Sequence, residues 1–386
     1  MKKIYLIKNL SPWMINELLA FSSLTPFRLI LLRQPSSMYL KDIEKLKVRG
    51  VEVFVKPFHP NPDLRKTVFA FRFALRNIPR FWGIKNFVFA VKALYWFTKL
   101  KDGLITEKSS IHAQFATQAS IIALLYKRYL KDVEYSFTFH AYDIYFKNRW
   151  FSFLVEESKI SFAISKFSIK YINDNYIDID ENRLILSRLG TFIPKIYPNF
   201  EKMGKLQGML VLGFLGTFVH EKNIFAVLKS MKDLVASGVW VKFFLAGYGP
   251  LEKSIKKFIV QHNLSEPIVL SGHIYGKEKE QFFKNIDVLI LPSISEGLPV
   301  VLMEALSYGC PIISTNISGI PEICKNGYNG FLIPPDDVTA LTDAILKFYY
   351  MDSEKFNQFR RNASESSREY DIVRNSRLKL KSMMWI

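Results

Sequence analysis

Short apolar runs alternate with longer amphipathic segments along almost the whole chain. The runs that predict strands are KKIYLI (2–7), FRLILL (27–32), VEVFVK (51–56), EYSFTF (134–139), SFAIS (161–165), MLVLGFLG (209–216), VKFFLAG (241–247), PIVLSG (267–272), DVLILP (287–292) and CPIIST (310–315). Segments such as 224–238 and 251–263 repeat their apolar residues at helical spacing. Strands and helices in alternation are typical of parallel sheets that are covered by helices on both faces.

This pattern restarts near Met209, after the stretch FIPKIYPNFEKMGK (192–205). A chain of 386 residues, 49% of them hydrophobic, is also longer than one core usually organises. We therefore read the stretch as a linker and predict an α/β chain with two doubly wound domains. Ligands of such sheets bind beyond the carboxyl ends of the strands, so the expected site is a central cleft between facing domains.

Composition excludes several classes of protein. The apolar fraction is too high for a disordered chain, and no apolar run reaches 18 residues without a charge, as a transmembrane helix would require. The first apolar stretch is too short for a secretory signal. Cys310 and Cys324 lie in apolar surroundings and predict buried thiols rather than disulfides or a zinc site, which favours the cytosol.

The charge of the chain is unevenly distributed. The formal net charge is +18, and residues 1–200 hold 31 basic and 16 acidic side chains, whereas residues 201–386 hold 22 and 19. The first hundred residues alone hold 18 basic and 5 acidic side chains. The first half is therefore expected to face an anionic partner.

A basic helix is predicted from Ile84 to Leu100. Its stripe of Ile84, Phe87, Val88, Val91, Leu94 and Tyr95 is expected to pack in the core. Lys85, Lys92 and Lys99 line up beside Phe89 and Trp96. This second face fits an anionic membrane interface, or else the two aromatic rings pack under a neighbouring element and leave a solvated lysine face. The charge of the first hundred residues favours the membrane.

The segment LPSISEGLPVVLMEALSYGCPIIST (291–315) is the most informative part of the sequence. It predicts a buried strand, a turn, and a short helix from about Pro299, as its first helical residue, to Tyr308, with Gly309 just beyond. The backbone N–H groups at the start of this helix would form a phosphate site. Two carboxylates, Glu296 in the turn and Glu304 in the helix, could accept hydrogen bonds from the hydroxyls of one ligand. From this spacing alone, one glutamate at a helix start and one solvated glutamate are the simpler explanation.

These residues and their surroundings resemble the retaining glycosyltransferases of family 4, which have the two-domain GT-B fold. The resemblance is carried by PSISEGLPVVLMEAL (292–306), GTFVHEKN (216–223), AGYGP (246–250), SGIPE (318–322) and NGFLIPPDD (329–337). In the first half, SIHAQFATQAS (110–120) and SFTFHAYDIY (136–145) resemble the branch that acts in exopolysaccharide and lipopolysaccharide assembly. Together these motifs cover most of residues 105–345.

The resemblance implies a role for each domain. Residues 1–195 would form a Rossmann-like domain on the acceptor side, to which the C-terminal segment 368–386 returns as a helix. Residues 196–367 would form the Rossmann-like domain that binds the nucleotide-sugar donor. The turn at the first strand (9–18) lacks the glycine pair common in the family, and Ser11 and the backbone around Pro12 stand there instead. The acceptor side is therefore left unassigned.

The resemblance also implies roles for individual residues. Glu304 would hold the ribose, Glu296 the donor sugar, and Lys222 the diphosphate, whose developing charge it would stabilise. His140 would face the cleft close to the donor sugar. The remaining residues of the expected donor site are Gly216, Thr217, Gly247, Gly297, Leu298, Pro299 and Val300.

From the residues alone, simpler explanations of two of these positions stay open. Lys222 would also fit a solvated lysine at a helix start, and His140 a packed or capping residue. Asp143 is interpreted as the N-cap of the helix that follows His140.

One position departs from the family. An arginine that binds the diphosphate normally follows the glycine of the first turn, but here Thr217 follows Gly216. Losing one charge-assisted hydrogen bond to phosphate costs about 1.5–3 kcal/mol. Three explanations of this difference stay open. Another cation takes the place of the arginine, the donor binds more weakly than in the family, or the protein is a degraded member of the family.

The expected function is the retaining transfer of a sugar from a nucleoside diphosphate to a glycan or lipid-linked glycan in surface polysaccharide synthesis. We expect a metal-independent, hexosyl-type enzyme without a cofactor that is peripheral on the inner face of the cell membrane. The alternative, suggested by Thr217, is a non-catalytic GT-B protein that binds a glycan or a membrane partner. Binding of nucleic acid, which the charge alone would suggest, is not expected because no nucleic-acid-binding signature occurs.

Overall fold

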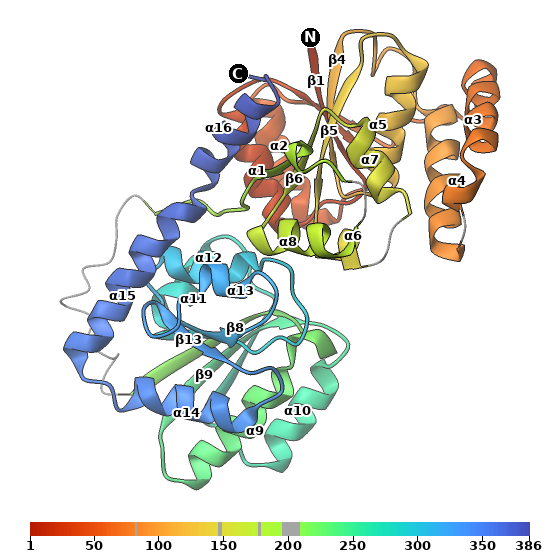
Figure 1. The fold of residues 1–386 in the computed structure, drawn as a ribbon. Helices are drawn as coiled ribbons and strands as arrows, with labels where there is room; N and C mark the ends of the chain where they lie inside the picture. Colours follow the sequence, from red (N-terminus) through yellow and green to blue (C-terminus); the bar gives the residue numbers. More distant parts are fainter. Residues whose placement is uncertain (82, 146–148, 177–178, 195–208) are drawn as a thin grey trace. The chain divides into compact units, whose positions relative to one another are not determined.

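The computed structural model describes residues 1–81, 83–145, 149–176, 179–194 and 209–386, and these form two compact units (Figure 1). The first unit consists of Met1–Leu189 and Ile372–Ile386, and the second of Gly190–Asp371. The sequence placed these two boundaries after residues 195 and 367. Most of the predicted linker, 192–205, lies outside the described residues.

The first unit is built on a parallel sheet of seven strands in the order β3-β2-β1-β4-β5-β6-β7. The strands are β1 (Lys2–Ile7), β2 (Arg28–Leu31), β3 (Glu52–Val55), β4 (Ser109–Gln114), β5 (Glu134–Phe139), β6 (Ile160–Ala163) and β7 (Leu184–Leu186). Side chains of β1 alternate between two cores, as expected for a strand with both faces covered: Ile4 and Leu6 enter one core, Tyr5 and Ile7 the other.

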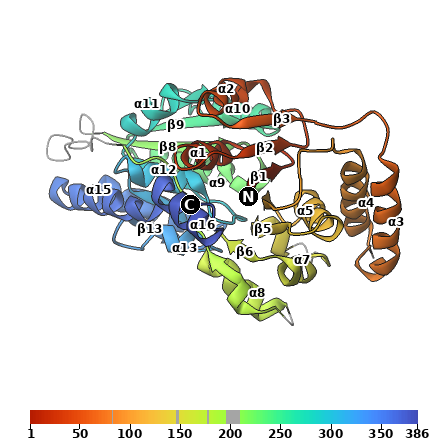
Figure 2. The same ribbon diagram turned by 90° about the horizontal axis from the view of Figure 1, so that it is seen from above.

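Helices cover both faces of this sheet. They are α1 (Pro12–Ser22), α2 (Leu40–Val48), α3 (Leu64–Arg76), α4 (Ile84–Lys99), α5 (Gln118–Tyr129), α6 (Ala141–Tyr145), α7 (Phe151–Glu157), α8 (Lys166–Asn175) and α16 (Ile372–Ser382), with short 3-10 helices at Ser37–Tyr39, Ile78–Phe81 and Glu181–Arg183. Residues of α1, α2 and α16 share the core of Tyr5, whereas α4, α5 and α7 share the core of Ile4. Helices α3 and α4 lie side by side at one edge of the unit (Figures 1 and 2).

The second unit contains a parallel sheet of six strands in the order β10-β9-β8-β11-β12-β13. The strands are β8 (Leu210–Thr217), β9 (Val241–Tyr248), β10 (Ile268–Gly272), β11 (Val288–Leu291), β12 (Ile312–Thr315) and β13 (Gly330–Ile333). The helices are α9 (Ile224–Ala236), α10 (Glu252–Gln261), α11 (Lys277–Asn285), α12 (Val300–Ser307), α13 (Ile320–Ile323), α14 (Val338–Tyr349) and α15 (Ser353–Ser367), with 3-10 helices at His220–Lys222 and Arg368–Tyr370.

The prediction of two parallel α/β domains is confirmed, and each of the ten predicted runs overlaps a strand. The structure adds β4, β7 and β13, which the apolar pattern did not predict. Within the described part of the chain, none of the helices has the length and apolarity that a membrane span requires. Cys310 and Cys324 are buried free thiols, as predicted.

The C-terminal segment is divided between the units. Its 3-10 turn, Arg368–Tyr370, belongs to the second unit, and α16 belongs to the first, where it packs on α1. The side chain of Trp385 is buried there, and its indole N–H donates a 2.8 Å hydrogen bond to Ser110 Oγ in β4. The end of the chain is thereby attached to the first sheet.

Helix α4 buries a different face from the predicted one. The buried side chains are Asn86, Ala90, Ala93, Phe97 and Thr98. The predicted core stripe is instead largely exposed: Ile84, Phe87, Val88, Val91 and Tyr95 have exposed fractions of 37–83%. The prediction of a core stripe is therefore wrong for these residues. The physical reason is that two alanines allow α4 to approach α5 closely, which a row of larger side chains would prevent.

The predicted lysine and aromatic face of α4 is also not free. The ring of Trp96 stacks on Phe58, with 6.2 Å between ring centroids, and Lys99 Nζ donates to Tyr95 Oη at 3.2 Å. Phe89 is partly buried, Lys92 is exposed, and the side chain of Lys85 lies outside the described residues. Of the two alternatives for Trp96, packing under a neighbouring element is the one observed.

Candidate functional site

The turn after β8 is fixed by Gly247 in β9. Strands β8 and β9 pair to their ends, where Thr217 lies opposite Tyr248, and Phe218 N–H donates to the carbonyl of Tyr248 at 2.7 Å. A side-chain carbon at Gly247 would lie 1.8 Å from the carbonyl oxygen of Gly216, so only glycine fits there. Thr217 is therefore held at the carboxyl edge of the sheet, with its side chain exposed.

Lys222 and Glu296 are brought together at this edge, although 74 positions separate them. Lys222 ends the 3-10 turn after β8, and its ammonium group forms an ion pair with Glu296 Oε1. Ser293 Oγ donates a 2.9 Å hydrogen bond to the same carboxylate oxygen. The two turns are also joined by their backbones, because Ile294 N–H donates to the carbonyl of Glu221 at 2.9 Å. Lys222 is thus a partner of Glu296, not a freely solvated lysine.

Helix α12 begins one residue later than predicted. Pro299 has extended backbone angles and stands at the N-cap, and Val300 is the first helical residue. The prediction that Pro299 is the first helical residue is therefore wrong, because its ψ of 113° keeps it outside the helix. Before it, Leu298 is buried and the carbonyl of Gly297 accepts a 3.2 Å hydrogen bond from Gly319 N–H. The helix ends with Tyr308 at the C-cap and Gly309 at a positive φ of 68°.

Glu304 lies inside α12 and is paired with a lysine that sequence reasoning missed. The carboxylate is buried, and its Oε1 forms an ion pair with Lys279 Nζ of α11 at 2.6 Å. Lys279 stands in the charged stretch KEKEQ, which reads as a solvated helix face and gives no sign of a partner 25 positions away. Glu296 and Glu304 therefore each form an ion pair with a different lysine of the second unit.

His140 follows β5 directly in the first unit and is buried between aromatic rings. Its ring centroid lies 4.8 Å from that of Trp13 and 4.5 Å from that of Phe115. Its Nε2 lies 3.1 Å from Gln114 Oε1. Burial, reinforced by the charge of Lys379, lowers the pKa of His140 to about 3, so the imidazole is neutral near pH 7.

Asp143 is not the N-cap of the helix after His140. It lies within α6, and its Oδ2 accepts a 2.9 Å hydrogen bond from the backbone N–H of His140, which precedes the helix. This reach back to the start of the helix is the geometry of the second half of a capping box. Burial raises the pKa of Asp143 to about 7.

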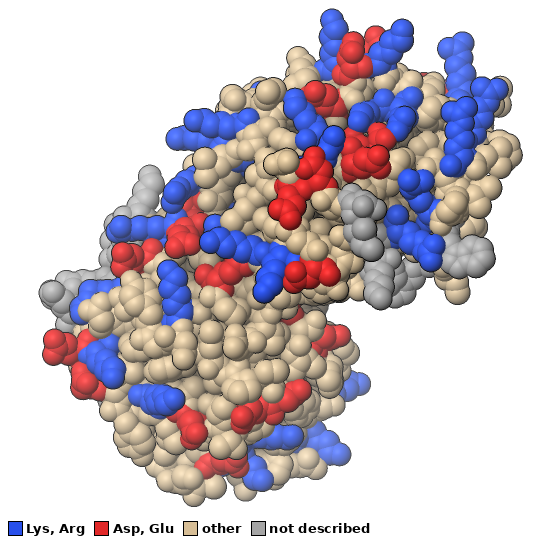
Figure 3. Space-filling view, in the orientation of Figure 1, with Lys and Arg blue, Asp and Glu red and all other residues tan. Residues whose placement is uncertain are grey.

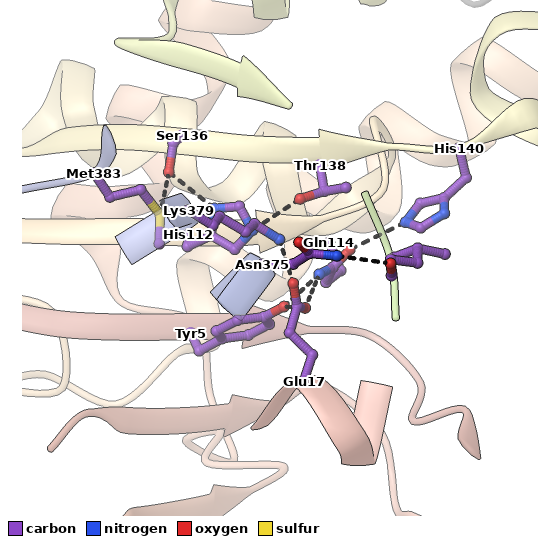
Figure 4. A network of polar contacts seen from close by, with 11 residues as sticks. Tyr5, Glu17, His112, Gln114, Ser136, Thr138, His140, Asn375, Lys379 and Met383 are labelled. Atoms are coloured by element: carbon purple, nitrogen blue, oxygen red, sulfur yellow. Dashed lines mark hydrogen bonds and ion pairs between the residues drawn. The ribbon is translucent and has the colours of Figure 1, made fainter. Parts of the chain in front are cut away.

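A buried polar network connects His140 to the C-terminal helix (Figure 4). Gln114 of β4, Glu17 of α1 and Lys379 of α16 form it, and sequence reasoning identified none of them as site residues. Gln114 falls inside the motif SIHAQFATQAS, which was the available signal for it. Glu17 and Lys379 lie 362 positions apart and carried no signal at all.

A pocket of the second unit is lined by residues other than the predicted ones, and the described residues contain no cluster of metal ligands. Within the ranges that the structure describes, no three His, Cys, Asp or Glu side chains gather as metal ligands would. A pocket of about 500 Å³ in the second unit is lined by residues such as Phe244, Ser271 and Gln281 and contains none of the predicted site residues.

Comparison with known proteins identifies the second unit. Residues 198–366 match the family model for glycosyl transferases group 1. A protein of Salmonella typhimurium named as the colanic acid biosynthesis glycosyltransferase WcaL is 30% identical over 179 residues, which are 45% of this chain and 43% of WcaL. The amylovoran biosynthesis glycosyltransferase AmsK of Erwinia amylovora is 31% identical over 33% of each chain. The chain thus spans less than half the length of these relatives.

Solved structures extend the likeness to the whole chain at the level of the fold. Anabaena HepE in complex with UDP superposes with a TM-score of 0.71 at 15% identity and covers 100% of both chains. A glycosyltransferase from Rickettsia africae gives a TM-score of 0.70 at 16% identity over 99% of this chain and 98% of that one. The second unit therefore matches the model of the glycosyl transferases group 1 family, and the chain as a whole has the GT-B fold.

Proposed function

We propose that this protein is a glycosyltransferase that moves a sugar from a nucleoside diphosphate donor to a glycan or lipid-linked glycan, with retention at the anomeric carbon. The observation that carries the proposal is the Lys222–Glu296 pair at the carboxyl edge of a sheet within the matched family domain. Two comparisons support it. HepE binds UDP, and an Escherichia coli relative, 26% identical over 46% of each chain, is named as a galactosyltransferase that uses UDP-Gal and a GlcNAc-diphosphoundecaprenol acceptor.

Lys222 and Glu296 would exchange partners when the donor binds. In the structure their charges neutralise each other, and a diphosphate would offer Lys222 a stronger anionic partner. Glu296, still held by Ser293, would then accept hydrogen bonds from hydroxyls of the donor sugar. Helix α12 follows the turn that contains Glu296, and its N-terminal backbone would add to the binding of phosphate. These positive groups would take the place of a metal ion at the leaving group.

Glu304 would hold the ribose of the nucleotide. One of its oxygens is occupied by Lys279, which fixes the carboxylate and leaves the other oxygen for a hydroxyl group. The ion pair also explains how a buried carboxylate is tolerated in α12 before a ligand arrives.

His140 would contribute from the first unit, as a neutral group near the donor sugar. Because its pKa is far below 7, it would position the sugar by hydrogen bonding and would carry no charge. The leaving diphosphate would assist deprotonation of the incoming hydroxyl on the same face of the sugar. Such a mechanism gives retention without an enzyme nucleophile.

Turnover with defined donors tests this proposal. We expect release of nucleotide from one of UDP-, GDP- or dTDP-sugars by the intact chain, and loss of at least 90% of that rate in Lys222→Ala and in Glu296→Ala. Lys256→Ala, which removes an exposed lysine of α10, is the matched control and should retain the rate. Undiminished turnover in both site variants would refute the assignment of the site.

We also propose that the first unit docks on an anionic membrane surface, at the inner face of the cell membrane, where a lipid-linked acceptor would lie. Helix α3 exposes Leu64, Val68, Phe71 and Leu75 at helical spacing, with exposed fractions of 45–76%, and α4 exposes the stripe described above. Figure 3 shows Lys and Arg side chains gathered over the part of the first unit that Figure 1 labels α3 and α4. Apolar stripes flanked by cations are what an interface with anionic lipid requires.

The docking face proposed here differs from the predicted one. The sequence placed Phe89 and Trp96 toward the membrane, but Trp96 stacks on Phe58 instead. The exposed residues Phe71 and Phe87 have exposed fractions of 65% and 54% and take over that role.

A further inference from the structure

The buried network of the first unit is a chain of hydrogen bonds with a charged group at its far end (Figure 4). Lys379 Nζ donates to Glu17 Oε1 at 2.5 Å. The other oxygen of that carboxylate accepts a 2.8 Å hydrogen bond from the amide nitrogen of Gln114, and it also accepts one from Tyr5 Oη. The amide oxygen of Gln114 lies 3.1 Å from His140 Nε2. Helices α16 and α1, strand β4 and the residue that follows β5 are thereby linked through side chains alone.

The carboxylate fixes the direction of every bond in this chain. A carboxylate is only an acceptor, so the Gln114 group that faces Glu17 must be its NH₂. The amide oxygen of Gln114 therefore faces His140. An amide oxygen is also only an acceptor, so His140 Nε2 must carry the proton. In a neutral imidazole the second nitrogen, Nδ1, then has a free lone pair.

The surroundings of His140 restrict both the orientation of its ring and the choice of tautomer. Trp13 and Phe115 lie against the ring and restrict its rotation. Among the described residues, Nδ1 has no hydrogen-bond partner, so no competing contact favours the other tautomer. Lys379 and Glu17 are both buried, which keeps water from exchanging with the chain.

We propose that Gln114, Glu17 and Lys379 are positioning residues that hold His140 as the Nε2–H tautomer, with Nδ1 presented as a hydrogen-bond acceptor for a hydroxyl group of the donor sugar. The C-terminal helix α16 thereby sets the hydrogen-bonding state of a residue that follows β5. The part that concerns the donor sugar rests on the proposed function. The part that concerns the tautomer does not.

The tautomer can be measured without any substrate. The chain has six histidines, so histidine-selective ¹⁵N labelling and two-bond ¹H–¹⁵N correlation spectra of the intact protein resolve them, and His140→Gln identifies the signal of residue 140. At neutral pH we expect the pattern of a protonated Nε2 and an unprotonated Nδ1. A protonated Nδ1, or a mixture of tautomers, in the unsubstituted protein overturns the proposal.

A single conservative change should invert the tautomer. In Glu17→Gln, Lys379 still donates, so the new amide must turn its oxygen toward Lys379 and its NH₂ toward Gln114. Gln114 must then turn its oxygen toward residue 17 and its NH₂ toward His140. Nε2 becomes an acceptor, and the proton moves to Nδ1. A spectrum of Glu17→Gln with an unchanged His140 tautomer contradicts the relay.

Two further variants keep the test decisive. Ser136→Ala removes the 2.9 Å contact from Ser136 to His112 in the same core, outside the relay, and should leave the His140 pattern unchanged. If Glu17→Gln does not fold, Gln114→Met, which is similar in shape but has no amide, should give a mixture of tautomers. A single Nε2–H tautomer in Gln114→Met would overturn the proposal.

Kinetics separate the two parts of the inference. We expect kcat/KM for the donor to fall at least tenfold in Glu17→Gln and to stay within twofold in Ser136→Ala. An inverted tautomer with unchanged kcat/KM would overturn the role toward the donor sugar. A protein that shows the expected tautomers but transfers no sugar from any donor would instead refute the proposed function and leave the relay standing.

Discussion

Two neighbouring residues, His140 and Asp143, are buried, and burial moves their pKa values in opposite directions. The pKa of His140 falls to about 3 and that of Asp143 rises to about 7. A depressed histidine contributes stability that is present above its unfolded pKa and is lost as pH falls toward 3. A raised aspartate contributes stability that is present at low pH and is lost as pH rises toward 7.

The variant Asp143→Asn isolates the second effect. Asparagine cannot ionise, and its side-chain oxygen can still accept the hydrogen bond from His140 N–H. Relative to the unsubstituted protein, the free energy of unfolding of Asp143→Asn should rise by about 2–4 kcal/mol between pH 4 and pH 8, since one pKa unit corresponds to about 1.4 kcal/mol. Urea denaturation at several pH values measures this. A difference that is constant with pH would show that Asp143 is ionised throughout.

A buried ion pair in the second unit gives a stability prediction. Asp287 and Arg360 are nearly inaccessible, with their charged groups 2.5 Å apart, and Asp287 also accepts a 2.9 Å hydrogen bond from Val211 N–H at the start of β8. Asp287→Asn leaves the guanidinium buried without its counter-charge. It should lower the free energy of unfolding by about 3–5 kcal/mol in urea denaturation.

An exposed pair is the control for that variant. Glu252 and Lys256 are 2.7 Å apart on the surface of α10. Glu252→Gln should change the free energy of unfolding by less than about 0.5 kcal/mol. Equal effects of Glu252→Gln and Asp287→Asn would mean that burial does not determine the strength of these pairs.

Functional residues could be predicted from the sequence where they stand close together in one motif. Glu296 and Glu304 were identified because they stand in one motif around a strand, a turn and a helix. Lys279 and Lys379 were not, because each meets its carboxylate only after the fold brings distant segments together. The ion pair of Lys222 with Glu296 was missed for the same reason, although each residue was identified separately.

At the scale of elements, the apolar pattern predicted the buried strands well and the polar or short ones poorly. The sequence of β4, SSIHAQ, contains two serines, a histidine and a glutamine, yet all six residues are buried because their polar groups find partners inside the fold. Strand β7 has only three residues, and β13 follows directly after a turn. Such strands are defined by their neighbours in the sheet rather than by their own composition.

Helix α4 shows what periodicity can and cannot determine. The 3.6-residue repeat correctly predicted a helix, and its bounds agree within one residue. It did not determine which face is buried, because Ala90 and Ala93 are smaller than the residues of the exposed stripe but allow closer packing. An exposed apolar stripe on both α3 and α4 is the consequence.

The membrane proposal makes a prediction at this scale. Replacing Phe71 and Phe87 together by serine should reduce cosedimentation with vesicles of phosphatidylglycerol and phosphatidylcholine at least fivefold at low salt, because both rings are exposed in the unbound protein. Trp240→Ser removes an aromatic side chain of the second unit that is 62% exposed, and it should have no effect. Equal binding by all three proteins, or no binding by the unsubstituted chain, would contradict the docking face.

For the whole molecule, the fold class followed from the alternation of strands and helices, and the match to known glycosyltransferase folds agrees with it. The excess of basic residues in the first half of the chain is explained by the proposal that the first unit docks on an anionic membrane. Thr217, at the exposed end of β8, stands where the resemblance to family 4 led us to expect an arginine. The central question about function is therefore whether Lys222, without a neighbouring arginine, is sufficient to bind the diphosphate.

Calorimetric titration of UDP, GDP and dTDP into the intact chain and into Lys222→Ala answers it most directly. We predict that one of the three nucleotides binds the unsubstituted chain with a micromolar dissociation constant. We expect Lys222→Ala to weaken that binding by at least tenfold, because a charge-assisted hydrogen bond is worth about 1.5–3 kcal/mol. The absence of binding by any of the nucleotides would instead identify a non-catalytic GT-B protein, and equal affinity in the variant would contradict the donor site proposed here.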